Sequence, residues 1–279
     1  MSTPYFQFKQ FTVWHDKCAM KVGTDGVLLG AWSPYPELRY VRALDIGTGC
    51  GLIALMIAQR LQRAGKRFAI QGIDCNTAAV NQAIQNFRRS PWADYMTCTP
   101  CALQDFQASM PYQLIVSNPP FFRNSLKNPD PNRAMARHTD SLSYEELFSC
   151  SVSMLSDDGM MSVIVPAEAE AEVLDTAAWQ GLLPMRIMHV RAKPKKAVKR
   201  VLIAFGKAAM VGPVKPRVRE FVLEASDATR SEEYIRLTKD FYVQSGEIAA
   251  DKVKEQTTDG NAQKPAVVEP KVLTLGQDK

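Results

Sequence analysis

The chain has 279 residues, of which 46% are hydrophobic and 23% charged, and its net charge is +5. This length can form one large α/β domain or two smaller ones, and we expect one. No apolar run approaches the roughly 18 residues of a membrane span. The N-terminal MSTPYFQFKQ lacks the basic start and apolar stretch of a signal peptide, so we expect a cytoplasmic protein without a membrane partner.

Strand and helix patterns alternate from residue 42 onward. RALDIG is predicted to be a strand and CGLIALMIAQRLQRAG a helix that ends at Gly65, and FAIQGID and NTAAVNQAIQNFRR repeat the pair. Further strands are predicted near 95–101 and 112–117. Ser143 and Glu146 suit a capping box at the start of a helix over about 143–155. This alternation indicates right-handed βαβ units and a doubly wound, mostly parallel α/β sheet.

The second half of the chain continues the pattern and then loses it. GMMSVIVP is predicted to be a strand, and a helix from Glu168 to Trp179 follows. Two strands near 184–192 and 199–206 are close enough to form a hairpin, which would place an antiparallel pair at the sheet edge. After a helix at SEEYIRLTKDFYV, residues 245–279 are polar and lack periodicity. We therefore expect one domain over residues 1–244 and a disordered tail over 245–279.

The cysteines and histidines do not predict a metal site. Six cysteines and three histidines are scattered along the chain. Cys98 and Cys101 form a CxxC, but neither a second pair nor a nearby histidine has zinc-ligand spacing. We interpret this CxxC as a chance placement, and we expect reduced thiols and no bound metal.

The segment DIGTGCG, residues 45–51, has the context of a ligand-binding glycine loop because it follows a strand and opens a helix. Gly47, Gly49 and Gly51 allow a tight turn and a close approach to a ligand, and the helix start supplies free amide donors. A dinucleotide loop would read G-x-G-x-x-G, and a P-loop would need Gly-Lys-Ser/Thr. Asp45 would repel a pyrophosphate and instead suits a cationic group, such as the amino group of a methionine-derived cofactor.

Two further acids follow the next two strands. Asp74 ends the second strand, where it could accept hydrogen bonds from ribose hydroxyls or simply cap a helix. Asp105, in LQDF after the third strand, could accept from an adenine amino group, with Phe106 against the ring. Three acids at the carboxyl ends of three successive strands favour a ligand site, because doubly wound sheets bind ligands at that edge.

The fourth strand ends in an unusual way, on SNPPF. Pro119 and Pro120 fix their own φ angles and restrict the residue before them, so Asn118 is held extended and Phe121 is projected at a fixed place. This rigidity favours a functional position for Asn118 and Phe121. The alternative is a proline-rich strand exit with Phe121 in the core.

With its glycine loop, acids and NPPF, the chain resembles the class I S-adenosylmethionine-dependent methyltransferases. This resemblance implies a Rossmann-like sheet of seven strands and S-adenosylmethionine as the cofactor. Asn-Pro-Pro-Phe after the fourth strand is similar to the signature of enzymes that methylate planar amino groups. Together with FKQFTVWHDKCAMKVGTDGVLLGAW, it resembles more closely the bacterial enzymes that N6-methylate the adenine beside the anticodon of a valine tRNA, over roughly residues 6–244.

The resemblance also implies roles for single residues. The Asn118 side-chain oxygen and the Pro119 carbonyl would each accept an N–H bond from the target amine, and Phe121 would stack on the base. Lys21 and Thr24 resemble the segment that closes over the methionine end of the cofactor. Residues 1–41 would therefore close over the cofactor.

Basic residues favour a polyanionic substrate. RIMHVRAKPKKAVKR, residues 186–200, carries seven Lys and Arg residues and no acid, which is typical of a polyanion-binding surface or, alternatively, of a solvated loop. The loop after NPPF adds four more cations that could grip phosphates around a base turned out of its stack, or merely face solvent: Arg123, Lys127, Arg133 and Arg137. We expect a monomeric enzyme that acts on tRNA.

Three other hypotheses remain open. A protein-glutamine N5-methyltransferase shares the Asn-Pro-Pro signature, but the 44 residues before Asp45 are too short for its helical N-terminal domain. An N2-guanine rRNA methyltransferase is usually longer, through a duplicated domain. A non-catalytic RNA-binding protein with a retained cofactor fold is the third, and the intact acceptor motif weakens it.

Overall fold

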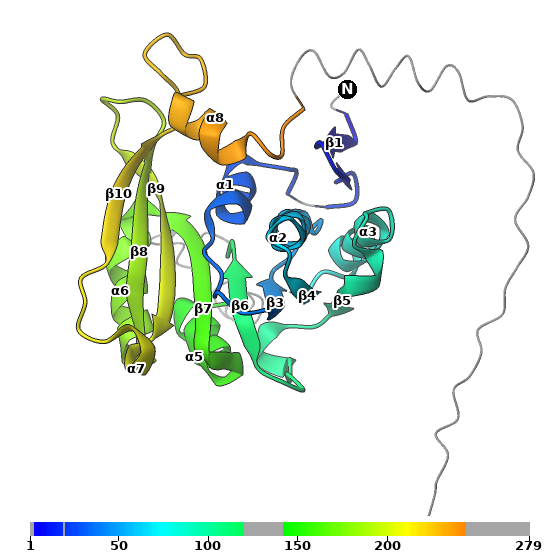
Figure 1. The fold of residues 1–279 in the computed structure, drawn as a ribbon, viewed down its shortest axis with the longest axis horizontal. Helices are drawn as coiled ribbons and strands as arrows, with labels where there is room; N and C mark the ends of the chain where they lie inside the picture. Colours follow the sequence, from blue (N-terminus) through cyan, green and yellow to red (C-terminus); the bar gives the residue numbers. More distant parts are fainter. Residues whose placement is uncertain (1–2, 19, 120–141, 244–279) are drawn as a thin grey trace, which may run out of the picture. The chain divides into compact units, whose positions relative to one another are not determined.

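The structure is a computed structural model that describes residues 3–18, 20–119 and 142–243. Its main feature is a sheet of eight strands in the order β10-β8-β9-β7-β6-β3-β4-β5 (Figure 1). The strands are β3 (Tyr40–Ile46), β4 (Arg67–Asp74), β5 (Met96–Pro100), β6 (Tyr112–Ser117), β7 (Leu155–Pro166), β8 (Leu182–Arg191), β9 (Val198–Lys207) and β10 (Arg217–Val222). The α-helices are α1 (Thr24–Trp32), α2 (Leu52–Arg63), α3 (Thr77–Arg88), α5 (Tyr144–Met154), α6 (Glu170–Trp179), α7 (Ala208–Val211) and α8 (Glu232–Thr238).

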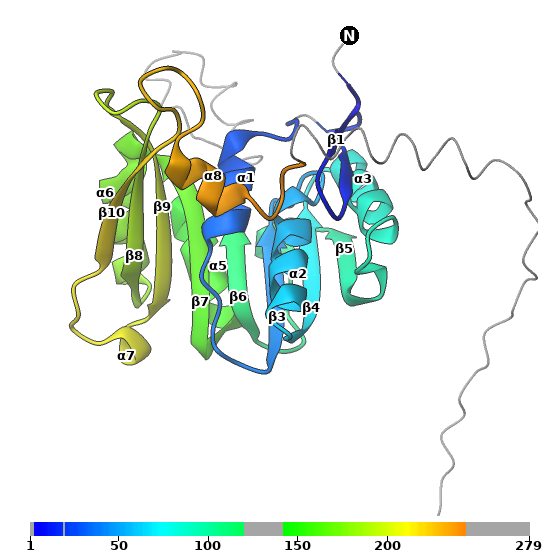
Figure 2. The same ribbon diagram turned by 45° about the horizontal axis from the view of Figure 1, so that its top comes forward.

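The sheet confirms the predicted doubly wound, mostly parallel arrangement. Every neighbouring pair of its strands is parallel except those made by β9, which is antiparallel to both β7 and β8. Helices pack on both faces, so the central strands are apolar on both sides, as in β6, where Leu114, Ile115 and Val116 are fully buried. Figure 2 shows α1, α2 and α3 on one face and α5 and α6 on the other.

Strand β10 was not predicted, and it changes the edge of the sheet. The predicted hairpin forms as β8–β9, but β10 pairs in parallel with β8 and becomes the edge strand. The sheet therefore has eight strands among the described residues, where the family resemblance implied seven. The sequence of β10, RVREFV, buries only Phe221, so it lacks the apolar alternation by which a strand is recognised.

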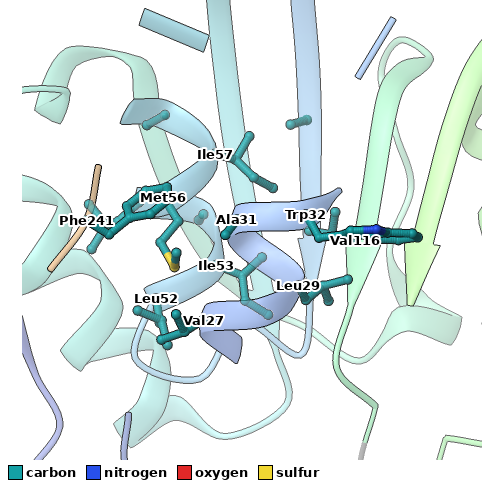
Figure 3. Packing of buried hydrophobic residues seen from close by; sticks show 14 of the residues in the cluster. Val27, Leu29, Ala31, Trp32, Leu52, Ile53, Met56, Ile57, Val116 and Phe241 are labelled. Atoms are coloured by element: carbon teal, nitrogen blue, oxygen red, sulfur yellow. The ribbon is translucent and has the colours of Figure 1, made fainter. Parts of the chain in front are cut away.

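Helix α1 was not predicted either, and two glycines bring it close to α2 (Figure 3). A Cβ at Gly26 would lie 2.9 Å from Leu52 Cδ2, and a Cβ at Gly30 would lie 2.8 Å from Met56 Cβ. At Gly30 a larger residue would push the helices apart, because Met56 Cβ is fixed by the backbone, whereas at Gly26 the end of the Leu52 side chain would have to shift. Because Leu52 is the first residue of α2, this packing brings the start of α1 beside the glycine loop.

The described residues up to Tyr242 form one compact unit. A short antiparallel hairpin of β1 (Tyr5–Gln7) and β2 (Thr12–Trp14) precedes α1. Helix α5 begins with the predicted capping box, in which Ser143 and Glu146 each bond the other's backbone amide. The predicted disordered tail, residues 245–279, lies outside the described residues and stays a prediction.

Candidate active site at the carboxyl edge of the sheet

The glycine loop turns sharply over the end of β4. Gly47, Gly49 and Gly51 have φ angles of +68°, +55° and +81°, which L side chains rarely adopt. The Gly47 and Thr48 amides both donate to the Ile73 carbonyl, at 2.9 and 3.0 Å. Nothing lies within 4 Å of where a Cβ would stand at Gly47 or Gly49, so a ligand can approach the backbone there.

Asp45 lies buried beneath this loop, and one of its carboxylate oxygens has no hydrogen-bond partner among the described residues. Its position in β3 places it on the same sheet face as Ala43, under α2. Oδ2 accepts hydrogen bonds from Thr48 Oγ1 at 2.7 Å and from the Ala54 amide at 3.1 Å. Oδ1 is buried and has no partner in the described part of the chain. The predicted role of Asp45 toward a cationic group of a ligand stays a prediction.

Burial raises the pKa of Asp45 to about 7. Loss of hydration is the main cause, because it disfavours the ionised form. The hydrogen bonds from Thr48 and Ala54 oppose this rise, whereas the nearby Asp74 carboxylate adds to it. A bound cation beside Oδ1 would favour the ionised form and lower this pKa again.

Asp74 holds the glycine loop in place. Its Oδ2 accepts from the Gly49 amide at 2.9 Å, and its Oδ1 accepts from the Asn76 amide at 2.8 Å. The helix-capping alternative does not apply to Asp74, because the Asn76 side chain is the N-cap of α3. Asp74 is half-buried at the carboxyl end of β4, and its predicted role toward a ribose stays a prediction.

Asp105 and Phe106 lie just after β5. Asp105 ends a 3₁₀ turn, Leu103–Asp105, and is exposed. Phe106 is half-buried and packs against the core on the α5 face of the sheet, so part of its ring is engaged in packing. Their predicted contacts with an adenine ring stay predictions.

Asn118 lies beside the start of the glycine loop. In the β3–β6 ladder Ile46 is opposite Ser117, whose hydroxyl donates to the Ile46 carbonyl at 3.0 Å. Asn118 is the next residue, and its Oδ1 is buried without a partner among the described residues. Leaving such an acceptor unsatisfied costs about 1–3 kcal/mol, and the predicted role of Asn118 toward a target amine stays a prediction.

The structure describes only part of the NPPF motif. Pro119 is buried directly after Asn118. Pro120 and Phe121, and the four cations predicted to grip phosphates in the following loop, lie outside the described residues. Their roles therefore stay predictions.

The N-terminal segment contacts the glycine loop through Asn86, a residue that sequence reasoning missed. This buried side chain of α3 accepts from the Trp14 amide at 3.0 Å and donates to the carbonyls of Trp14 and Cys50, both at 2.8 Å. The Cys18 thiol also lies within hydrogen-bonding reach of the Cys50 thiol. In the sequence, the only signal for the role of Asn86 was a polar residue at a helix position that faces the core.

Lys21 precedes helix α1, and Thr24 is the first residue of that helix. Lys21 is exposed, whereas Thr24 is half-buried as the first residue of α1. The next residue, Asp25, accepts a 2.7 Å hydrogen bond from Arg200 Nε of β9. Closure of residues 1–41 over a cofactor stays a prediction.

The basic run over residues 186–200 is partly neutralised by acids from other elements. Arg191 pairs with Glu220 at 2.8 Å, Lys193 lies 4.0 Å from Glu224, and Arg200 pairs with Asp25. Three lysines of the run make no ion pair with the described residues: Lys195, Lys196 and Lys199. The free charge at this hairpin is therefore smaller than the sequence suggested.

Two further observations concern ligands and membranes. Among the described residues, no three His, Cys, Asp or Glu side chains are grouped so that they could hold a metal ion. The helices in the same ranges are all too short or too polar to cross a membrane. Cys98 and Cys101 of the CxxC are free and half-buried, and burial raises the pKa of Cys98 to about 12.

Comparisons with known proteins show which proteins the chain is similar to. The methyltransferase small domain family model matches residues 33–178. The tRNA1(Val) (adenine(37)-N6)-methyltransferase of Bacteroides fragilis is 47% identical over 251 residues, which cover 87% of this chain and 99% of the relative. The enzyme of the same name from Aeromonas hydrophila is 42% identical over 238 residues, covering 85% and 97%. A solved structure from Agrobacterium tumefaciens, described as a predicted O-methyltransferase, shares the fold with a TM-score of 0.57 at 14% identity, covering 78% of this chain and 96% of its own.

Proposed function

Because the chain belongs to the family of the tRNA1(Val) (adenine(37)-N6)-methyltransferases, we propose that it methylates N6 of adenine 37, the adenine 3′ of the anticodon, in a valine tRNA. The chain is a methyltransferase, and its methyl donor is S-adenosylmethionine. The proposed substrate is supported by these relatives, because the alignments with this chain cover almost the whole length of each relative.

The observation that carries this proposal is the Asn118 Oδ1 just after β6, which is buried and has no partner among residues 3–18, 20–119 and 142–243. An exocyclic adenine amine is a poor nucleophile, because its lone pair is delocalised into the ring. Asn118 Oδ1 and the Pro119 carbonyl accept its two N–H bonds, which favours a pyramidal nitrogen with a localised lone pair. These acceptors act on the amine only as it becomes nucleophilic, so they stabilise the transition state more than the ground state.

The other site residues would hold the cofactor, which supplies a methyl group on a sulfonium centre when it is bound. Asp45 Oδ1 would accept from its amino group, and Asp74 would accept from its ribose hydroxyls. The open backbone at Gly47 and Gly49 lets it approach closely. Asn118 cannot take up a proton, so the alkylated amine releases its proton to solvent.

We propose further that the enzyme works as a monomer in the cytoplasm. The edge strand β10 supports a monomer, because Arg217 and Arg219 are exposed on this strand and charged residues oppose pairing between sheet edges. Sedimentation of the purified protein at several concentrations tests the oligomeric state.

Nucleoside mass analysis tests the proposed reaction. Purified protein, labelled S-adenosylmethionine and a valine tRNA transcript should yield labelled N6-methyladenosine in the fragment that contains adenine 37. Asn118→Ala should abolish most of this product, whereas the matched control Asn81→Ala, at an exposed position of α3, should not. Labelled N2-methylguanosine in rRNA, or a labelled protein glutamine, would contradict the proposal.

A further inference from the structure

Three arginines gather on one face of the outer strands. Arg217 of β10 is directly opposite Arg186 of β8 in their parallel ladder, and Arg219 is opposite Met188. Because side chains alternate along a strand, Arg217 and Arg219 point to the same face, which Arg186 shares. This is the α1 face of the sheet, since the Arg186 guanidinium lies 5.1 Å from the centre of the Trp32 ring.

These arginines are not neutralised within the described part of the protein. None of their side chains makes a hydrogen bond or ion pair with a described residue, although the nearby Arg191 and Arg200 both have acidic partners. Burial lowers the pKa of Arg186, and the positive charges of Arg219 and Arg217 lower it further. The cluster is therefore self-repulsive, and a bound anion would relieve the repulsion.

The arginine cluster lies in line with the proposed catalytic residue. In the strand registers, Arg219 of β10 is opposite Met188 of β8, and Met188 is opposite Leu202 of β9. Leu202 is in turn opposite Ile164 of β7. Ile164 follows Val163, which is opposite Ser117, so it is level with Asn118. The three apolar residues of this row all belong to the core on the α1 face. Arg219 is thus four strand spacings from Asn118, about 19 Å at about 4.8 Å per spacing.

We propose that Arg186, Arg217 and Arg219 bind phosphates of the helical stem of the RNA that carries the target adenine. This inference rests on the proposed function. A distance of about 19 Å is several times the roughly 3.4 Å separation of stacked bases, so the cluster contacts RNA beyond the immediate neighbours of the target base. Double-stranded RNA is recognised mainly through its shape and phosphates, and arginine suits phosphate because its planar group donates two parallel hydrogen bonds.

The double variant R217Q/R219Q tests this site without disturbing the core, because both side chains are exposed. Its binding to an anticodon stem-loop RNA should weaken about tenfold at moderate salt. The slope of log affinity against log salt should flatten by about 1.4 to 1.8, from two lost phosphate contacts. Binding to a linear RNA with the loop sequence alone should change much less. R217K/R219K keeps the charge and should restore most of the salt slope.

A matched control removes the same charge elsewhere. R67Q/R88Q neutralises two exposed arginines at the first residue of β4 and the last residue of α3, and it should bind the stem-loop like wild type. Wild-type affinity and salt slope in R217Q/R219Q would overturn the inference, as would an equal loss in the control or with linear RNA. Binding is scored separately from methylation. Failure of the wild type to methylate adenine 37 would contradict the proposed function, while the binding curves would still decide the role of the arginines.

Discussion

Asp45 should make the stability of the ligand-free protein depend on pH in a defined direction. Its carboxyl is fully buried in the folded state with a pKa of about 7, against 3.8 as the ordinary value. Between these values the folded state holds a proton that the unfolded state has lost. Stability from this group is therefore fully present below about pH 4 and is lost as pH rises to about 7.

The size of the effect follows from the shift. From 3.8 to about 7 is about three pKa units, and at about 1.4 kcal/mol per unit this corresponds to about 4 kcal/mol across the whole range. The local slope is a loss of about 1.4 kcal/mol of unfolding free energy per pH unit between about pH 5 and 7. Other groups titrate in this range too, so the contribution has to be isolated by a variant.

Asp45→Asn supplies that comparison, since it keeps an acceptor oxygen for Thr48 and Ala54 but has no charge to titrate. Urea unfolding of both proteins at several pH values gives the difference in their free energies of unfolding. Wild type should lose stability relative to the variant by about 1.4 kcal/mol per unit from about pH 5 to 7, and by little above about pH 8. A pH-independent difference would show that Asp45 is already ionised in the folded protein, which would refute the reasoning.

Three other predictions concern the site and its supports. Asn118→Ala should keep cofactor affinity and lose about a hundredfold in single-turnover methylation, whereas Asn118→Asp, which keeps its acceptor oxygens, should retain partial activity. Gly49→Val should abolish cofactor binding in calorimetry, because its φ of +55° strains a valine; unchanged affinity would place the cofactor elsewhere. Gly30→Ala should lower the free energy of unfolding by about 1–3 kcal/mol in urea, through overlap with Met56 Cβ, and an unchanged value would mean that α1 shifts freely.

Much of the sheet could be predicted because its central strands are buried on both faces. Strands β3, β6 and β7 carry apolar runs bounded by glycine, proline or polar residues, and periodicity alone finds such strands. Helix α1 was missed because it is buried nearly all round, so it has no polar stripe to mark it as a helix. Gly26 and Gly30 also obscured it, since glycine in a helix is unfavourable unless close packing requires it.

The candidate site divides in the same way between local and non-local information. The positions of the glycine loop and of the acids at the carboxyl ends of β3 and β4 were predictable, because each is tied to a strand end, where a parallel sheet gathers ligand-binding residues. The role of Asn86 could not be predicted, because it depends on contacts with Trp14 and Cys50, which are 72 and 36 residues away in the sequence. No local pattern encodes such a contact.

The basic surface shows why a run of charges in a sequence does not locate the free charge in a fold. β10 lies parallel to β8, and this pairing brings Glu220 to Arg191 and so neutralises part of the 186–200 run. The same pairing stacks Arg217 and Arg219 beside Arg186 on the opposite face, where no described acid meets them. The position of a cation in the sheet thus decides whether it remains available to a phosphate. The edge strand β10 neutralises Arg191 of the hairpin through Glu220, and it adds two arginines to the α1 face.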